Sequence, residues 1–120
     1  MLLYAQLIVA VLVGYLNIWL GIVHIWYYTV WWWDIPTHFL AGMWVGFFAA
    51  WLLANWQKRA KVWHCALFAL AIGILWEIFE VYEGTGGSPF MPYWIDTIKD
   101  LTMDVLGGAL AGFLAKYARI

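Results

Sequence analysis

The first stretch of the chain, MLLYAQLIVAVLVGYLNIWLGIVHIWYYTVWWW (Met1–Trp33), contains no aspartate, glutamate, lysine or arginine. A helix that crosses the hydrocarbon core of a membrane needs about 20 mainly apolar residues, and this stretch exceeds that length. It is also too long, and lacks the basic leader, for a cleaved signal peptide. We therefore expect a first membrane-spanning helix over about residues 3–30.

The composition of the whole chain is typical of a membrane protein. Of its 120 residues, 67% are apolar and 11% are charged, whereas soluble domains average about 45–50% and about 25%. The formal net charge of -1 gives no electrostatic reason to expect a nucleic-acid partner. The single cysteine, Cys65, excludes an intramolecular disulfide and any Cys-x-x-Cys metal motif.

Three further apolar stretches predict three further spans. The runs are too long for membrane strands and do not alternate as strands would. The predicted fold is therefore all-α: a four-span transmembrane helical bundle that forms a single integral membrane domain over residues 1–120. The later spans are expected over about residues 35–56, 62–82 and 95–115.

Local signals mark the ends of these spans. The second opens with Asp34-Ile-Pro-Thr, in which we expect Asp34 to be the N-cap and Pro36 to lie in the first turn. Glycines and prolines between Glu83 and Trp94 predict the turn that joins the third span to the fourth.

The charged residues predict the orientation. Cytoplasmic ends of membrane helices carry an excess of lysine and arginine, and the acidic residues of this chain gather toward the opposite end, where tryptophans and tyrosines form an aromatic belt. Both termini are therefore expected to be cytoplasmic. The basic residues that fall at the same end as the termini are Lys58, Arg59, Lys61, Lys116 and Arg119.

Acidic and imidazole side chains recur at helical spacing in three of the predicted spans. Residues three or four apart share one face of a helix. An ionised carboxylate at the bilayer centre costs about 2.5–3.5 kcal/mol, so these faces are expected to turn toward one another rather than toward lipid. The groups are Asp34 with His38, Glu77 with Glu80, and Asp96 with Asp100 and Asp104.

Convergence of these faces predicts a divalent metal site near the outer face. Oxygen-rich sites with one imidazole suit Mg, Mn, Fe or Zn better than copper. Protons, water or Lys99 can also compensate the charge, and Asp34 and Asp96 can simply be favoured near helix N-termini. The predicted ligands are Asp34, His38, Glu77, Glu80, Asp100 and Asp104.

Small residues predict where two of the helices meet. Gly42 and Gly46 continue the His38 face of the second span, and Gly108 and Gly112 form a small-xxx-small pair on the fourth. We expect these two helices to approach closely there.

The chain resembles the YjdF-like family of small prokaryotic membrane proteins and, more distantly, the VanZ-like family associated with glycopeptide-antibiotic resistance. The resemblance covers residues 34–112, and the first span has no matching motif. It implies a multi-pass protein of the prokaryotic cytoplasmic (inner) membrane whose shared polar core is the ligand set named above. The matching blocks are Asp34-Ile-Pro-Thr-His38-Phe-Leu-Ala-Gly42, Trp76-Glu77-Ile-Phe-Glu80 and Asp96-Thr-Ile-Lys-Asp100-Leu-Thr-Met-Asp104-Val-Leu-Gly-Gly108.

Three kinds of function fit these features. The first is a metal-dependent hydrolase of a lipid or lipid-linked phosphate, whose metal polarises a phosphoryl oxygen or activates water; Thr37, Thr97 and Thr102 are weak candidate nucleophiles. The second is a non-catalytic accessory or structural subunit of a larger membrane complex, respiratory or photosynthetic, or a homo-oligomer, which the 11 tryptophans favour. The third is a proton or ion pathway along the aspartates, although the cytoplasmic halves of the spans lack matching polar residues.

His24 lies among tryptophans and tyrosines. A haem or pigment ligand would fit such a setting, and a packing role at the membrane interface is the more common one.

Overall fold

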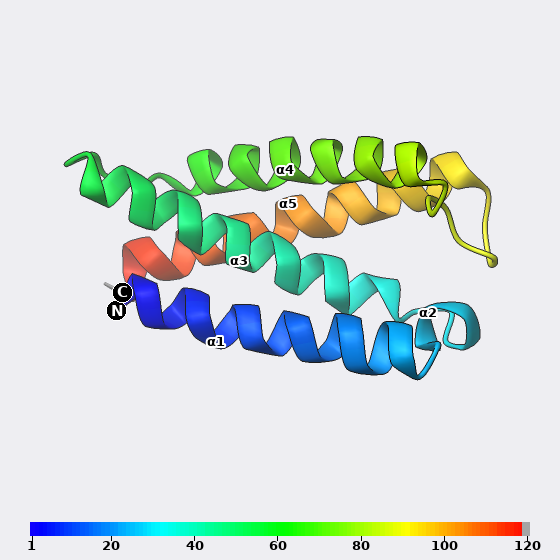
Figure 1. Cartoon of the computed structure of the whole chain (residues 1–120). Helices are drawn as coiled ribbons and strands as arrows, with labels where there is room; N and C mark the ends of the chain where they lie inside the picture. The colour runs from blue at the N-terminus through cyan, green and yellow to red at the C-terminus, as the bar shows by residue number, and fades with distance from the viewer. Residues whose placement is uncertain (119–120) are drawn as a thin grey trace.

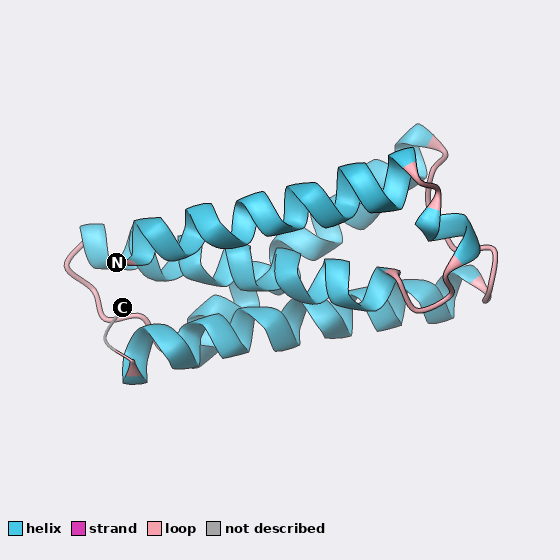
Figure 2. Ribbon diagram, turned by 90° about the horizontal axis from the view of Figure 1, so that it is seen from below, coloured by secondary structure: helices cyan, strands magenta, loops and turns pink. Residues whose placement is uncertain are grey.

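The computed structural model describes residues 1–118 and is built of helices (Figure 1; Figure 2). Within those residues it contains no strand, only an isolated bridge between Ser88 and Met91, so the predicted all-α class is confirmed. The elements are α1 (Leu2–Gly14) continuing as the π-helix η1 (Tyr15–Val23), the short α2 (Trp26–Thr29), α3 (Asp34–Asn55), α4 (Val62–Glu83) and α5 (Tyr93–Tyr117).

Three helical segments in the described part of the chain are long and apolar enough to cross a membrane: Leu2–Val23, Asp34–Asn55 and Val62–Glu83. The second and third match the spans predicted over residues 35–56 and 62–82, and the first overlaps the span predicted over residues 3–30. Helix α5 is 25 residues long, but it carries too many charged residues to count among these apolar segments. The fourth span therefore stays a prediction.

The first span is shorter than predicted. It ends at Val23, and Ile25 then adopts a left-handed backbone with φ of 54°, which is unfavourable for a β-branched residue. The apolar residues continue without a break to Trp33, so hydropathy alone could not locate this turn. The chain instead folds into α2 before α3 begins.

Asp34 is the first residue of α3, and the N-cap is Trp33. The prediction of Asp34 as the N-cap is therefore wrong. A capping side chain must accept a hydrogen bond from a nearby backbone N–H, whereas the Asp34 carboxylate is paired with Lys99 and His38.

Helices α3, α4 and α5 pack on one another, and α1 packs along α3 (Figure 1). The contact of α3 with α5 depends on glycine, as predicted for Gly42, Gly46 and Gly108: Gly42 lies against the backbone of Asp104, and Gly46 lies against Gly108. The prediction is wrong for Gly112, which faces Val62 and Cys65 of α4. Gly107, which the sequence analysis did not single out, faces the backbone of Phe39 and Met43. Close backbone approach of this kind leaves no room for a Cβ atom.

The two ends of the bundle differ in charge. Helices α3 and α5 begin at one end, which we call the acidic end, and α4 finishes there (Figure 1). The start of α1, the α3–α4 loop with its basic residues, and the end of α5 lie at the opposite, basic end (Figure 1). Of the predicted basic residues, Arg119 lies outside the described residues.

Tyr27 of α2 stabilises the turn between η1 and α2 at the acidic end. Its ring packs on Gly21, and its hydroxyl donates a hydrogen bond of 2.5 Å to Asn17 Oδ1 of η1. Burial raises the pKa of Tyr27 to about 12, so the phenol stays a neutral donor.

Replacing Tyr27 with phenylalanine is expected to lower the free energy of unfolding by about 1 kcal/mol, because a partly buried hydrogen bond is lost and Asn17 is left unpaired. Tyr28→Phe is the control, since Tyr28 is 70% exposed, and should change stability little. Unfolding in mixed micelles followed by tryptophan fluorescence measures both. Equal stability of the two variants would contradict the role assigned to Tyr27.

Candidate functional site

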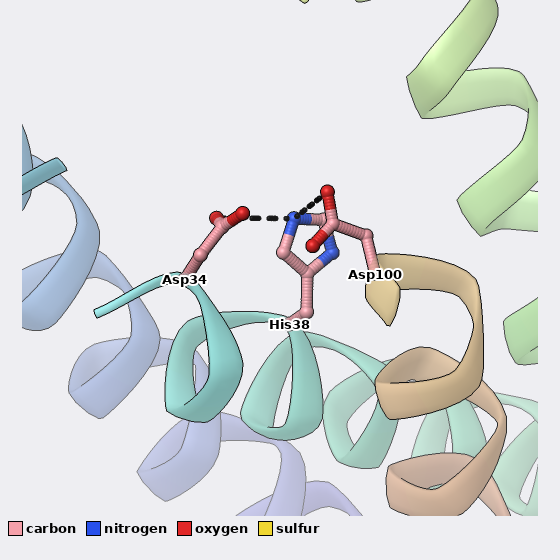
Figure 3. A group of neighbouring side chains, drawn as sticks. All are labelled: Asp34, His38 and Asp100. Atoms are coloured by element: carbon pink, nitrogen blue, oxygen red, sulfur yellow. Dashed lines mark ion pairs between the residues drawn. The ribbon is translucent and has the colours of Figure 1, made fainter. Parts of the chain in front are cut away.

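The acidic faces of α3 and α5 meet at the acidic end of the bundle. Asp34 and His38 lie one turn apart on α3, and Asp100 projects from α5 toward them (Figure 3). The close packing at Gly42 and Gly107 lets these short side chains reach one another across the helix interface.

His38 is at the centre of this group. Its Nε2 lies 3.5 Å from Asp34 Oδ1 and 3.5 Å from Asp100 Oδ2, while its Nδ1 lies 3.2 Å from Asp104 Oδ1. An N–H on Nδ1 that donates to Asp104 leaves the lone pair of Nε2 pointing between the other two carboxylates. One donor atom from each of Asp34, His38 and Asp100 lies within 4.8 Å of the others. The arrangement can hold a metal ion.

Asp104 is held between two helices. One oxygen is paired with His38 of α3, and the other lies against the Cα of Gly73 on α4, where a Cβ atom would collide with it. Asp104 therefore orients the imidazole, and Gly73 makes the space for its carboxylate. Gly73 was not predicted, since a single glycine in an apolar helix carries no signal of its own.

Lys99 contacts the aspartates of this site on the side away from His38. Its Nζ donates to Asp96 Oδ1 at 2.9 Å and to Asp34 Oδ2 at 3.1 Å, and it lies 3.5 Å from Asp100 Oδ1. Asp96 is buried by this contact, so it is more than a residue favoured at a helix start. The pairing role considered for Lys99 is confirmed.

Glu77 and Glu80 of α4 are not part of the donor group around His38. Glu77 is buried on α4, and its Oε2 accepts a hydrogen bond of 3.2 Å from Thr97 Oγ1 of α5. Its Oε1 has no hydrogen-bond partner among residues 1–118. The set of donors close enough to share an ion, searched over the described residues, contains neither glutamate. Metal ligation by these two residues stays a prediction.

The cluster carries more negative than positive charge. When Asp34, Asp96, Asp100 and Asp104 are all ionised, Lys99 and a protonated His38 offset only two of the four charges. Buried carboxylates need protons or a cation to neutralise them. A divalent ion would supply the missing charge.

The threonines considered as nucleophiles are engaged elsewhere. Thr37 donates to the carbonyl oxygens of Trp33 and Asp34, and Thr102 donates to that of Ile98. Thr97 donates to the Glu77 carboxylate, so each of the three hydroxyls is already engaged in a hydrogen bond. His24 is exposed and its ring packs edge-on against Trp19 at 5.1 Å, in keeping with the packing role.

Comparisons with known proteins agree with the membrane assignment. A family model described as "Predicted membrane protein (DUF2238)" matches residues 2–119. No curated protein and no solved structure matches the chain. With its apolar helices, the match supports a multi-pass membrane protein, while the YjdF-like and VanZ-like names stay interpretations of the motif blocks.

Proposed function

The chain belongs to the predicted membrane protein family DUF2238, and we propose that its function rests on a divalent metal ion held by Asp34, His38 and Asp100. Asp104 orients the imidazole. Glu77 and Glu80 lie on the neighbouring helix α4. They complete the predicted ligand set if their side chains move to coordinate the ion.

The single observation that carries this proposal is the placement of His38 Nε2, 3.5 Å from one carboxylate oxygen of Asp34 and 3.5 Å from one of Asp100. Ligands bound to one ion at about 2.1 Å stand about 3 to 4 Å apart, so these separations suit a shared ion. The carboxylate on Nδ1 is the usual partner of a metal-binding histidine, because it sets the tautomer and ring orientation. The oxygen-rich donor set favours Mg, Mn or Fe over Zn.

We place the centre near the outer face of the membrane, with both termini in the cytoplasm. The basic residues of the α3–α4 loop and Lys116 lie at the opposite end of the bundle, as the positive-inside rule requires of a cytoplasmic face. Helix α5 is then the fourth span. Its internal charges are compatible with this, since the aspartates are buried against α3 and α4 rather than exposed to lipid.

The reaction class that suits this position is metal-dependent hydrolysis of a lipid or lipid-linked phosphate. A metal at the membrane surface can polarise a phosphoryl oxygen and lower the pKa of a bound water, which then serves as the nucleophile. The lack of a free hydroxyl nucleophile among the three threonines favours water. An accessory-subunit role is the second candidate, supported by large exposed aromatics on every long helix, such as Tyr15, Trp44, Trp76 and Phe113.

An ion pathway is less favoured. On the basic side of Asp104 the α3–α4–α5 interface in the described chain is filled by small apolar residues, with Ala49, Cys65 and Ala111 fully buried. A conducted ion would meet no oxygen ligand there.

Metal analysis tests the proposal. Protein purified in mild detergent is expected to bind about one Mn²⁺ per chain, as followed by electron paramagnetic resonance and elemental analysis. Asp100→Asn should weaken binding at least about tenfold, since it removes one ligand charge. The matched control is Glu83→Gln, an exposed acid at the end of α4, which should bind as the wild type does. Absence of binding, or equal loss in the control, would refute the metal centre.

A phosphatase screen with and without chelator then tests catalysis. A metal-loaded protein that is inactive on every lipid phosphate, and that co-purifies with defined partners, would favour the accessory-subunit role.

A further inference from the structure

Lys99 already provides a positive charge at the proposed metal centre. Its Nζ lies within 3.5 Å of oxygens from three aspartates, and its side chain is only 17% exposed. A lysine that merely reached for water would point past the acidic end of the bundle. This one turns inward to the carboxylates.

We propose that Lys99 is a tethered cation that competes with the divalent ion for Asp34 and Asp100, and that metal binding releases it from both. The inference rests on the metal centre proposed above and adds its regulation. When the ion is absent, the ammonium group is the cation that pairs with the two carboxylates. When the ion binds, Lys99 keeps only Asp96.

The first support is that Asp34 and Asp100 each contact both His38 and Lys99, through different carboxylate oxygens. Asp34 turns Oδ1 toward His38 and Oδ2 toward Lys99, and Asp100 does the same with Oδ2 and Oδ1. A metal ion next to His38 Nε2 would therefore lie close to Nζ, across the same two carboxylates. Two cations at such short range repel in a buried site, so each weakens the binding of the other.

The second support is that Lys99 satisfies Asp100 poorly. Asp100 is 2% exposed, yet its Oδ1 has no hydrogen-bond partner within residues 1–118, and the ammonium group stays 3.5 Å away. A buried carboxylate oxygen without a hydrogen bond is unfavourable. The lysine therefore neutralises the Asp100 carboxylate incompletely, and a metal ion bound through Oδ2 on the His38 side would neutralise it better.

The third support is Asp96, which can remain the ion-pair partner of Lys99 when Asp34 and Asp100 bind the metal. Asp96 makes the shortest of the three ion pairs, and it lies one turn closer to the start of α5. It is not among the donors that could share an ion, within the described chain. Lys99 can therefore swing toward the acidic end of the bundle and remain paired.

Mn²⁺ titration of three proteins tests the competition. Lys99→Met is expected to bind Mn²⁺ at least about tenfold more tightly than the wild type, because the competing charge is gone while the ligands remain. Lys116→Met, which removes an exposed lysine at the basic end, is the matched control and should bind as the wild type does. Equal or weaker binding by Lys99→Met would overturn the inference and leave the metal centre standing. No binding by any of the proteins would overturn both.

Asp96 is tested by a double-mutant cycle. Asp96→Asn should weaken Mn²⁺ binding in the wild-type background, since Lys99 then relies on Asp34 and Asp100 alone. In the Lys99→Met background the same substitution should have no effect. A loss of affinity in both backgrounds would make Asp96 a ligand and overturn its role as the partner of the released lysine.

A measurement on the wild-type protein covers the case in which Lys99→Met does not fold. A water-soluble acylating reagent should modify Lys99 several times faster with Mn²⁺ than with chelator, as read by peptide mass spectrometry, while the rate at Lys116 stays constant. Recovery of folded Lys99→Met by Mn²⁺ would further support the inference, because the ion replaces the missing charge. Unchanged or slower modification of Lys99 in the presence of Mn²⁺ would overturn it.

Discussion

Replacing His38 with alanine is expected to raise the dissociation constant for Mn²⁺ at least about 100-fold. Nε2 of His38 is the donor atom that both carboxylates of the proposed centre face. The substitution also removes the partner of Asp104, whose Oδ1 is paired with Nδ1 of the same ring. Loss of a ligand and loss of its orientation therefore act together.

The measurement is Mn²⁺ titration by electron paramagnetic resonance, with His64→Ala as the control. His64 lies at the start of α4, where its ring accepts a hydrogen bond from the backbone N–H of Lys61. It is at the basic end, far along the bundle from the centre, and its removal should leave Mn²⁺ affinity unchanged. Retained affinity in His38→Ala would exclude the imidazole as a ligand.

Asp104→Asn separates ligation from orientation. Loss of a carboxylate that orients a metal-bound histidine typically lowers affinity about 10- to 100-fold, less than loss of the histidine itself. An effect equal to that of His38→Ala would make Asp104 a direct ligand, as the sequence analysis predicted.

The sequence predicts which residues turn inward but not which of them meet. Spacing of three or four residues assigns Asp34 to the same face as His38, and the cost of charge in lipid turns that face toward the other helices. The rotation of each helix about its own axis decides the partners, and spacing does not contain it. For this reason Lys99 could be placed with the aspartates only as one of several options, and spacing alone could not decide whether Glu77 and Glu80 reach the group around His38.

The helix contacts that determine this rotation are backbone contacts. Gly42 was predicted because it continues the face of His38, whereas Gly107 and Gly73 stand among other small or apolar residues with no pattern to mark them. The end of the first span was missed for a related reason. Its apolar residues continue past Val23 into α2, so the turn depends on backbone conformation at Ile25 rather than on hydropathy.

Replacing Gly107 with alanine is expected to lower the free energy of unfolding by about 3 kcal/mol or more. A Cβ atom at this position would collide with the carbonyl oxygen of Phe39 and the backbone nitrogen of Met43. These are backbone atoms of α3, which cannot move aside as a side chain can, so the two helices must separate. Their separation would also draw His38 away from Asp100 and weaken Mn²⁺ binding.

Gly14→Ala is the matched control. Gly14 is also helical, and a Cβ atom there would meet nothing within 4 Å in the described structure, so the substitution should preserve or slightly raise stability through helix propensity. Unfolding in mixed detergent and SDS micelles, followed by circular dichroism, compares the two variants under one condition. If Gly107→Ala matched Gly14→Ala in stability and still bound Mn²⁺ like the wild type, the close contact of α3 with α5 would not be what brings the metal ligands together.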